Sequence, residues 1–400
     1  MAFTATMVAF TGLPRGYMLP NILFILFLAA TLLEYFRGGF VLYVNRIIIA
    51  FALVTVGSTL PVIVGTATSE VMATEHIIRS CQILLMIILY TGYLDSLPRF
   101  RRVVVSAAVG FLTSFTIGHL IQHNTFADRA VALYQNPNSA AFWSMFTLFN
   151  LWLLQHLEPG RRFRASYIAF TLVAMASAFW LTVASVSRKV LVALFLPLSI
   201  IVGNKIMRGH FRLFYLIITL FLVTGSAAIF YKLSPILVRT RLESAISSIT
   251  TEQGREHSLT SRMEYYKTGF ALIKENPILG YGGGAFIILG LERSITIEHN
   301  IDAHSVFLDI YLESGLLGIL AYLGLYISMI SPIMKCKTRG INKMIIISFI
   351  VSMLFIQLGG SIQLDKYMWL SISLISAWLK LHQGVEAVPT PVGVRAGFRS

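Results

Sequence analysis

The sequence predicts an all-α, polytopic membrane protein: a bundle of about 11 or 12 transmembrane helices. Of its 400 residues, 56% are hydrophobic and only 12% are charged, about half the roughly 25% of charged residues in a soluble protein. Apolar stretches recur along almost the whole chain, and most are long enough to cross a hydrocarbon core of ~30 Å as a helix. The loops between them alternate in basic charge. A water-soluble enzyme is therefore excluded.

Eleven apolar segments are predicted spans, the seventh of them short. They are residues 19–36, 47–64, 77–94, 103–121, 138–156, 165–183, 190–203, 213–231, 304–330, 344–360 and 367–382. Residues 1–18 are apolar but interrupted by threonine, glycine and proline, so an extra span there stays open. They lack the basic region of a cleavable signal.

Basic residues gather in alternate short loops. Fifteen of them lie in five loops that we assign to the cytoplasm, since positive charge favours that side: Arg37, Arg46, Arg99, Arg101, Arg102, Arg161, Arg162, Arg164, Lys205, Arg208, Arg212, Lys335, Lys337, Arg339 and Lys343. The short loops on the opposite side hold only four basic residues. The net charge of +14 is thus explained by loop charge, and no nucleic-acid partner is expected. Cys81 and Cys336 are too few for a disulfide framework or a thiolate metal site.

This topology divides the chain into four parts. Residues 1–231 carry the N-terminal transmembrane helices, 232–303 an outer loop region with short helices, 304–382 the C-terminal transmembrane helices, and 383–400 a cytoplasmic tail. The outer region holds eight basic and eight acidic side chains. This balanced charge fits a small domain outside the membrane.

One helix is predicted within the outer region. Ser261 and Glu264 have the spacing of a capping box, which predicts that the helix begins there. Asn276-Pro277 ends it, because the residue before proline avoids helical geometry. We expect the helix to lie along the membrane surface on one apolar face, formed by Met263, Tyr266, Phe270 and Ile273.

Three cations on the outer side are candidate binding residues. Arg262 in a first helical turn, beside unpaired backbone amides, would form an anion site; the alternative is a salt bridge to Glu264 or another loop carboxylate. Arg188 and Lys189 lie where the insertion bias disfavours basic residues. They either bind an anion or extend to the outer headgroups.

The segment Gly280–Phe286 contains four glycines. Gly282 and Gly283 could let a backbone cradle approach a pyrophosphate closely. The spacing matches neither a P-loop nor GxGxxG, so a plain turn is the alternative.

His304 opens the ninth span at the outer face, where an imidazole can meet both water and a lipid headgroup. It is a candidate general base; the alternative is an interfacial histidine that caps the span. Glu313 would lie about 180° away on a straight helix, so we do not expect it to orient His304. His119 and His123 have metal-ligand spacing but no third ligand nearby.

One longer pattern is informative. His304-Ser305, nine intervening residues and then Gly315-Leu316-Leu317-Gly318 resemble the signature of the O-antigen ligase family, which shares a superfamily with the O-antigen polymerases. Ser187-Arg188, Arg262 followed by Asn276-Pro277-Ile278-Leu279-Gly280, and Asn136-Pro137-Asn138 extend the likeness over about residues 130–325. Val192 departs from a leucine that is common in the family, a mild apolar change.

The resemblance implies a glycosyltransferase of the bacterial inner membrane, with its active site facing the periplasm. The donor would be a glycan linked to undecaprenyl diphosphate, and the acceptor a hydroxyl of lipid A-core. His304 would be the base, and Arg188 and Arg262 would bind and stabilise the diphosphate. Lys189, Ser305, Gly282 and Gly283 would contact substrate. Neither metal nor cofactor is expected.

Two other functions remain open from the sequence. A polymerase would transfer the growing chain to another lipid-linked repeat unit, and the motifs scarcely separate it from a ligase. A flippase or other transporter of lipid-linked oligosaccharide would also be basic and polytopic. Transporters tend to carry ionisable groups at mid-membrane, whereas the basic residues here gather at the loops.

Overall fold

The computed structural model describes residues 18–37, 44–121, 125–126, 129–130, 137–157, 165–184, 252–293, 303–336, 340–358 and 366–383, and positions 190, 193 and 197. The described helices are α2 (Met18–Phe36), α3 (Arg46–Val64), α4 (Glu70–Tyr93), α5 (Leu97–Ile121), α6 (Pro137–Leu157), α7 (Ala165–Ala184), α11 (Glu252–Glu275), α12 (Ala285–Arg293), α13 (Val306–Lys335), α14 (Gly340–Gln357) and α15 (Lys366–Gln383). A two-residue ribbon, β1 (Thr125–Phe126) with β2 (Arg129–Ala130), is the remaining element.

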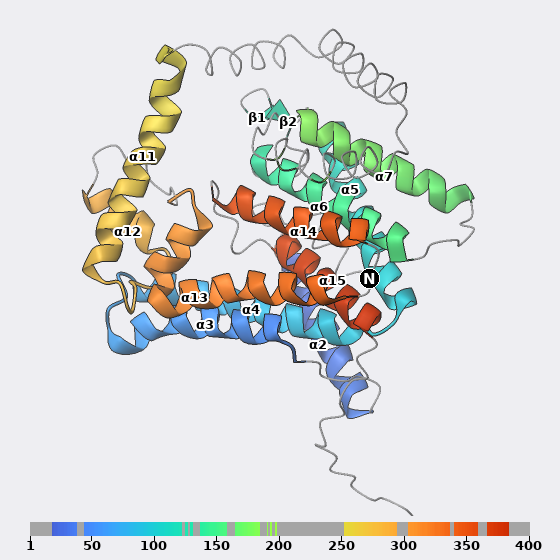
Figure 1. Ribbon diagram of the computed structural model, residues 1–400, viewed down its shortest axis with the longest axis horizontal. Coiled ribbons are helices and arrows are strands. Elements are labelled where there is room, and N and C mark those ends of the chain that lie inside the picture. Colours follow the sequence, from blue (N-terminus) through green and yellow to red (C-terminus); the bar gives the residue numbers. More distant parts are fainter. Residues whose placement is uncertain are drawn as a thin grey trace, which may run out of the picture.

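The predicted all-α bundle is confirmed (Figure 1). Nine of the eleven predicted spans coincide with described helices, and the seventh and eighth lie largely or wholly outside the described residues. Four helices are long and apolar enough to cross a membrane: α3, α4, the Leu97–Gly118 part of α5, and α13. Shorter apolar helices accompany them. The chain is a multi-pass membrane protein.

Helices α3 and α13 form the closest pair in the bundle. A Cβ atom on Gly57 of α3 would lie 3.1 Å from the backbone nitrogen of Gly318 on α13, so the two backbones can approach only because glycine stands there. Next to this contact, the buried hydroxyl of Ser58, which follows Gly57, lies 2.8 Å from that of Ser314, one turn before Gly318, and the two share a hydrogen bond. The glycines therefore hold α13 at a fixed place against α3.

Helix α15 lies in the centre of the bundle, and most of its side chains are fully buried. Its Trp369 ring packs on Phe51 of α3 at 4.2 Å between ring centroids, and Tyr367 packs on Trp143 of α6 at 4.6 Å. Because hydrocarbon offers no hydrogen-bond partners, buried polar groups pair with one another. Thus Tyr367 also shares a hydrogen bond of 2.8 Å with Thr147.

Contacts at the helix ends match the predicted alternation of sides. Thr68, between α3 and α4, donates its backbone N–H to the carbonyl of Tyr281 in the outer region (3.0 Å). At the other end of α3, the Asn45 amide donates to the hydroxyl of Ser376 near the end of α15 (2.5 Å). Loops assigned to one side thus lie together, while the identity of the cytoplasmic side stays a prediction.

Helix α11 begins earlier than predicted. It starts at Glu252, nine residues before Ser261, and ends at Glu275 directly before Asn276-Pro277, as expected. A capping box contributes only about 1 kcal/mol, and the preceding segment contains good helix formers, so the helix continues through it. Ser261 is consequently an interior residue and not a cap.

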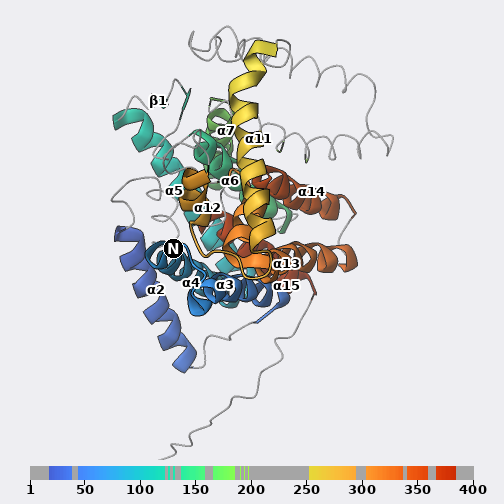
Figure 2. The same cartoon turned by 90° about the vertical axis from the view of Figure 1, so that its left-hand side faces the viewer.

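The four residues of the predicted apolar face of α11 differ in burial, and their predicted contact with the membrane stays a prediction. Ile273 is buried, but the Met263 and Phe270 side chains are 56% and 58% exposed. The contact with α13 is instead centred on Gly269, where an added Cβ would lie 2.5 Å from Leu308. In both views α11 runs across the end of α13 and not along it (Figures 1 and 2), an orientation compatible with a helix on the membrane surface.

Candidate active site at the outer end of α13

Helix α13 is interrupted at Gly315, which has φ 60° and ψ −158°. Such an interruption frees backbone groups that an unbroken helix pairs internally. The segment after α11 supplies partners for these groups through three backbone hydrogen bonds: Leu316 N–H to Ile278 O (3.1 Å), Tyr281 N–H to Leu312 O (2.7 Å) and Gly282 N–H to Glu313 O (3.1 Å). Residues 276–284, which we call the inserted loop, are therefore built into the helix interruption.

Glycines make this insertion possible. A Cβ on Gly315 would lie 2.1 Å from the carbonyl oxygen of Ile278, and one on Gly280 would lie 2.7 Å from the nitrogen of Gly315. Gly280 also has φ 78°, where glycine is strongly favoured. Asn276 closes the loop by donating its side-chain amide to the Gly280 carbonyl (2.6 Å). The Asn-Pro-x-x-Gly motif and the first glycine of the Gly-x-x-Gly motif thus fit one another.

Glu313 anchors the inserted loop from α13. One carboxylate oxygen accepts the N–H of Gly284 (2.9 Å), and the other lies 3.4 Å from Nδ1 of His76 on α4. The contact with His76 is an ion pair only when the imidazole is protonated. Glu313 faces this loop and not His304, in agreement with the helical geometry of the sequence. His76 was not predicted, because nothing in the sequence of α4 indicates that it meets residue 313.

Gly282 and Gly283 are buried against α4. A Cβ on Gly282 would lie 3.1 Å from that of Ala73, and one on Gly283 would lie 2.2 Å from that of His76. The Gly282 N–H is already used by Glu313. Packing explains both glycines, and their predicted contact with substrate stays untested.

His304 has an unusual backbone. Its φ of 57° makes it the single non-glycine residue with positive φ in the described ranges, a conformation that costs roughly 1–2 kcal/mol for an L-residue with a Cβ. The imidazole is partly exposed and packs on the ring of Tyr265 of α11, 5.6 Å between centroids. Strain of this kind is often kept at functional sites.

The residues around His304 are buried. Ala303 and Ser305 are buried on either side of it, and Asp309 lies on the first turn of α13. Ser305 occupies the N-cap position, but its hydroxyl makes no capping hydrogen bond. The side chain of Asp309 instead accepts the N–H of Ala303 (3.1 Å). The predicted contact of Ser305 with substrate is not tested by this geometry.

Arg262 does not stand where the sequence argument placed it. Because α11 begins at Glu252, its amides at this position are paired within the helix, and the predicted anion site at a helix start is wrong. The alternative salt bridge with Glu264 is not formed either. The partly exposed Arg262 lies one turn from Tyr265, on the part of α11 that meets His304. Arg188 and Lys189 lie outside the described residues.

Charged residues flank the inserted loop. Glu275, at the end of α11, forms a two-pronged ion pair with Arg293 at the end of α12, and this hydrogen bonding lowers the pKa of Glu275. Burial raises the pKa of the Tyr281 hydroxyl, and the charge of Glu275 raises it further. Tyr281 is therefore protonated and donates to the carbonyl of Leu272 on α11 (3.2 Å).

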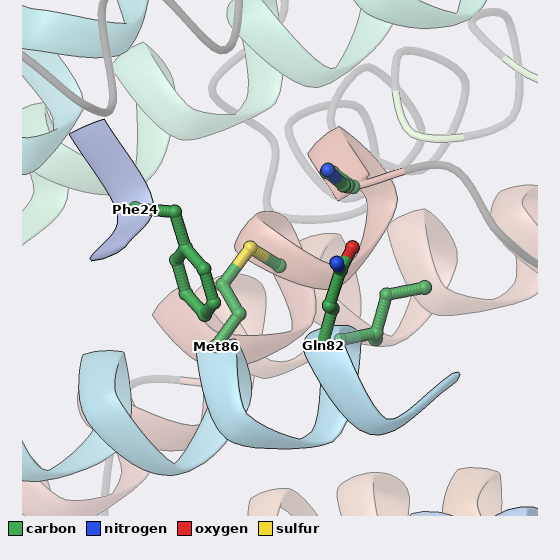
Figure 3. A pocket seen from close by; sticks show the side chains of 5 residues that line it. Phe24, Gln82 and Met86 are labelled. Atoms are coloured by element: carbon green, nitrogen blue, oxygen red, sulfur yellow. The ribbon is translucent and has the colours of Figure 1, made fainter. Parts of the chain in front are cut away.

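A separate recess with an interior volume of about 10 Å³ lies between α2, α4 and α15. Phe24 and Met86 form its apolar part, with Gln82 beside them (Figure 3); Ile83 and Lys366 complete the lining. None of the predicted site residues that the structure describes lines it. Its interior volume is roughly the space of one water molecule, so the recess is too small for a ligand pocket.

The likeness of this chain to known proteins lies in a sequence family. The curated proteins contain no match. Residues 164–323 match the family described as O-antigen ligase, and this range includes α11, the inserted loop, His304 and both glycines of the Gly-x-x-Gly motif. Over this range the chain is similar to the O-antigen ligase family, and the match supports a relation to the O-antigen ligase superfamily.

Proposed function

We propose that this protein is an O-antigen ligase-type glycosyltransferase that moves a glycan from undecaprenyl diphosphate to a hydroxyl of lipid A-core. The observation that carries the proposal is the meeting of His304 with Tyr265 at the outer end of α13, one helical turn from Arg262. The imidazole of His304 thus contacts the turn of α11 that follows Arg262, within the segment that matches the family.

His304 is the general base in this proposal. It removes the proton of the acceptor hydroxyl as the oxygen attacks the anomeric carbon of the donor sugar. The bond between that carbon and the diphosphate oxygen breaks, and undecaprenyl diphosphate leaves with the electron pair. The partial exposure of the imidazole leaves it open to an acceptor.

Arg262 and Arg188 stabilise the leaving diphosphate. The guanidinium of Arg262 forms no ion pair within the described ranges, so it is available to an anionic ligand. Arginine suits this task because its planar fork contacts two phosphate oxygens at once. Two such cations compensate the charge that a divalent metal ion neutralises in other transferases, so we propose that transfer is metal-independent.

The location follows from the loop charges. We propose that the protein lies in the inner membrane, with His304, Arg262 and the outer region 232–303 facing the periplasm. The four-part division of the chain at residues 231, 303 and 382 is part of the same proposal. Donor and acceptor then reach the site from the outer leaflet. Lys189 and Ser305 are proposed as further contacts of the substrate.

Deletion of the gene tests the reaction. If the protein is a ligase, gel electrophoresis of lipopolysaccharide will show core without polymer, and lipid-linked polymer will accumulate. Core that bears a single repeat unit would identify a polymerase instead. Lipid-linked repeat units retained on the cytoplasmic side would indicate a transporter and overturn the proposed chemistry.

A further inference from the structure

One residue holds the backbone on both sides of His304. The carboxylate of Asp309 accepts the N–H of Ala303, with 3.1 Å between Oδ1 and nitrogen, and the backbone N–H of Asp309 donates to the carbonyl of Ser305 at 2.9 Å. Asp309 is only 3% exposed and Ala303 is fully buried. The residues before and after His304 are therefore both tied to the same position of α13.

This arrangement matters because His304 is in a left-handed conformation. A residue with a Cβ rarely adopts φ 57°, and it does so only where its surroundings hold it there. The bond from Ser305 to Asp309 belongs to the regular start of the helix, so it forms with any residue at position 309. The bond to Ala303 depends on the side chain of Asp309 and has no substitute in the Ser305 hydroxyl, which makes no capping bond.

We propose that Asp309 is a positioning residue for His304: its carboxylate holds the N–H of Ala303, the residue before His304, so that the imidazole stays against the Tyr265 ring. The inference rests on the proposed role of His304 as base. Asp309 acts through hydrogen bonding and touches no substrate. Relaxation of the backbone would turn the imidazole away from Tyr265 and out of reach of the acceptor hydroxyl.

Kinetics of three variants test the role. The substrates are the lipid-linked glycan and the lipid A-core that accumulate in the deletion strain. Asp309→Ala should lower kcat on the order of 10²-fold, as a misplaced catalytic group does, with KM for the donor unchanged within about threefold. Asp309→Asn keeps an acceptor oxygen and should retain kcat within about fivefold. The matched control Ser314→Ala loses a buried hydrogen bond elsewhere on α13 and should keep full activity.

Thermal unfolding gives a second readout that needs no activity. Glycine adopts positive φ without strain, whereas alanine does not. Asp309→Ala should therefore lower the Tm by the same amount in wild type and in the His304→Ala background, and by clearly less in the His304→Gly background. The difference between the alanine and glycine backgrounds separates the effect on the backbone conformation of residue 304 from the general effect of losing a buried hydrogen bond.

The outcomes separate the two proposals. An equal loss of Tm in all three backgrounds, or an Asp309→Asn enzyme as slow as Asp309→Ala, would overturn the hydrogen-bond role of Asp309. Full activity in Asp309→Ala together with an inactive His304→Ala would do the same and leave the base intact. Full activity in His304→Ala together with the predicted difference in Tm would overturn the base and leave Asp309 as the residue that holds this turn.

Discussion

At the scale of single residues, Tyr265 connects the two candidate catalytic side chains. Its ring lies 5.6 Å from that of His304 between centroids, and Arg262 precedes it by one turn of α11. Tyr265 itself is 5% exposed, so it is a fixed surface and not a group free to react. In the proposed mechanism, the distance from base to diphosphate is therefore set by a helix that is packed on α13.

Replacement of His304 tests its role as base. His304→Ala should lower the rate of transfer on the order of 10²–10⁴-fold, the usual contribution of general base catalysis. Donor binding should persist, because the diphosphate is assigned to the arginines. Rate and donor affinity are measured on purified enzyme. A variant that fails because it no longer binds the lipid-linked donor would place His304 in the diphosphate site.

Replacement of Arg262 tests the leaving-group site. Arg262→Ala should abolish transfer at normal expression, and Arg262→Lys should restore little, since a point charge cannot contact two phosphate oxygens in a fixed plane. The matched control is Lys267→Ala, an exposed cation of the same helix, which should transfer at the wild-type rate. Full activity in Arg262→Ala would remove this residue from the site.

At the scale of elements, the two glycines of the Gly-x-x-Gly motif have different tasks. Gly315 interrupts α13 and accommodates the inserted loop, whereas the backbone of Gly318 is the surface on which Gly57 of α3 packs, and a Cβ on Gly318 itself would lie 2.1 Å from Cβ of Ser314 on the same helix. One short motif therefore fixes both the loop and the neighbouring helix relative to His304. The spacing of three residues places the two contacts on nearby sides of α13.

Gly315→Ala should destabilise the protein strongly. The new Cβ would lie 2.1 Å from Ile278 O at a φ of 60°, so the loop must leave the interruption. We expect a loss of at least about 2 kcal/mol in the free energy of unfolding and loss of transfer. Gly324→Ala on the same helix is the control, because its Cβ meets no atom within 4 Å, and it should be neutral or slightly stabilising. Equal effects of the two variants would refute the role given to Gly315.

The raised pKa of the Tyr281 hydroxyl predicts that its contribution to the stability of the protein depends on pH. Its pKa is raised in the folded protein, so its contribution to stability is complete below the unfolded value of about 10 and is lost as the pH rises through the folded pKa. The difference in Tm between wild type and Tyr281→Phe should therefore be constant from neutral pH to about 10 and shrink above it. A difference that grows with pH would contradict the hydrogen bond to Leu272.

At the scale of the whole molecule, the sequence predicted the helices better than the site. Length and apolar composition placed the spans within a few residues of α2, α3 and α13, because a membrane-crossing helix must be long and apolar. The start of α11 was missed, since a local cap is weaker than the tendency of a helix to continue. His304 and Arg262 were predicted through motifs, and their roles stay predictions.

The remaining parts of the site arise from tertiary contacts. The left-handed backbone of His304, its hydrogen bond through Asp309 and the meeting of His76 with Glu313 join residues on different turns or helices. No local pattern encodes such pairs, because each side chain has many possible partners in the sequence. Gly282 and Gly283 show the same limit: their packing against α4 became visible only in the fold.

The orientation of the bundle in the membrane gives the last prediction. The structure brings the loop between α3 and α4 to the inserted loop and the start of α3 to the end of α15, so each of these two ends of the bundle faces one side. Charge alternation predicts that the first of these sides is periplasmic. In a background without Cys81 and Cys336, a cysteine at position 258 should react in intact spheroplasts with a thiol reagent that cannot cross the membrane. A cysteine at position 162 should react only after the membrane is opened.

Because His304 and Arg262 lie at the end that contains residue 258, the reverse labelling would place them on the cytoplasmic side. Such a result would rule out transfer at the outer leaflet, whatever the activity of the single variants.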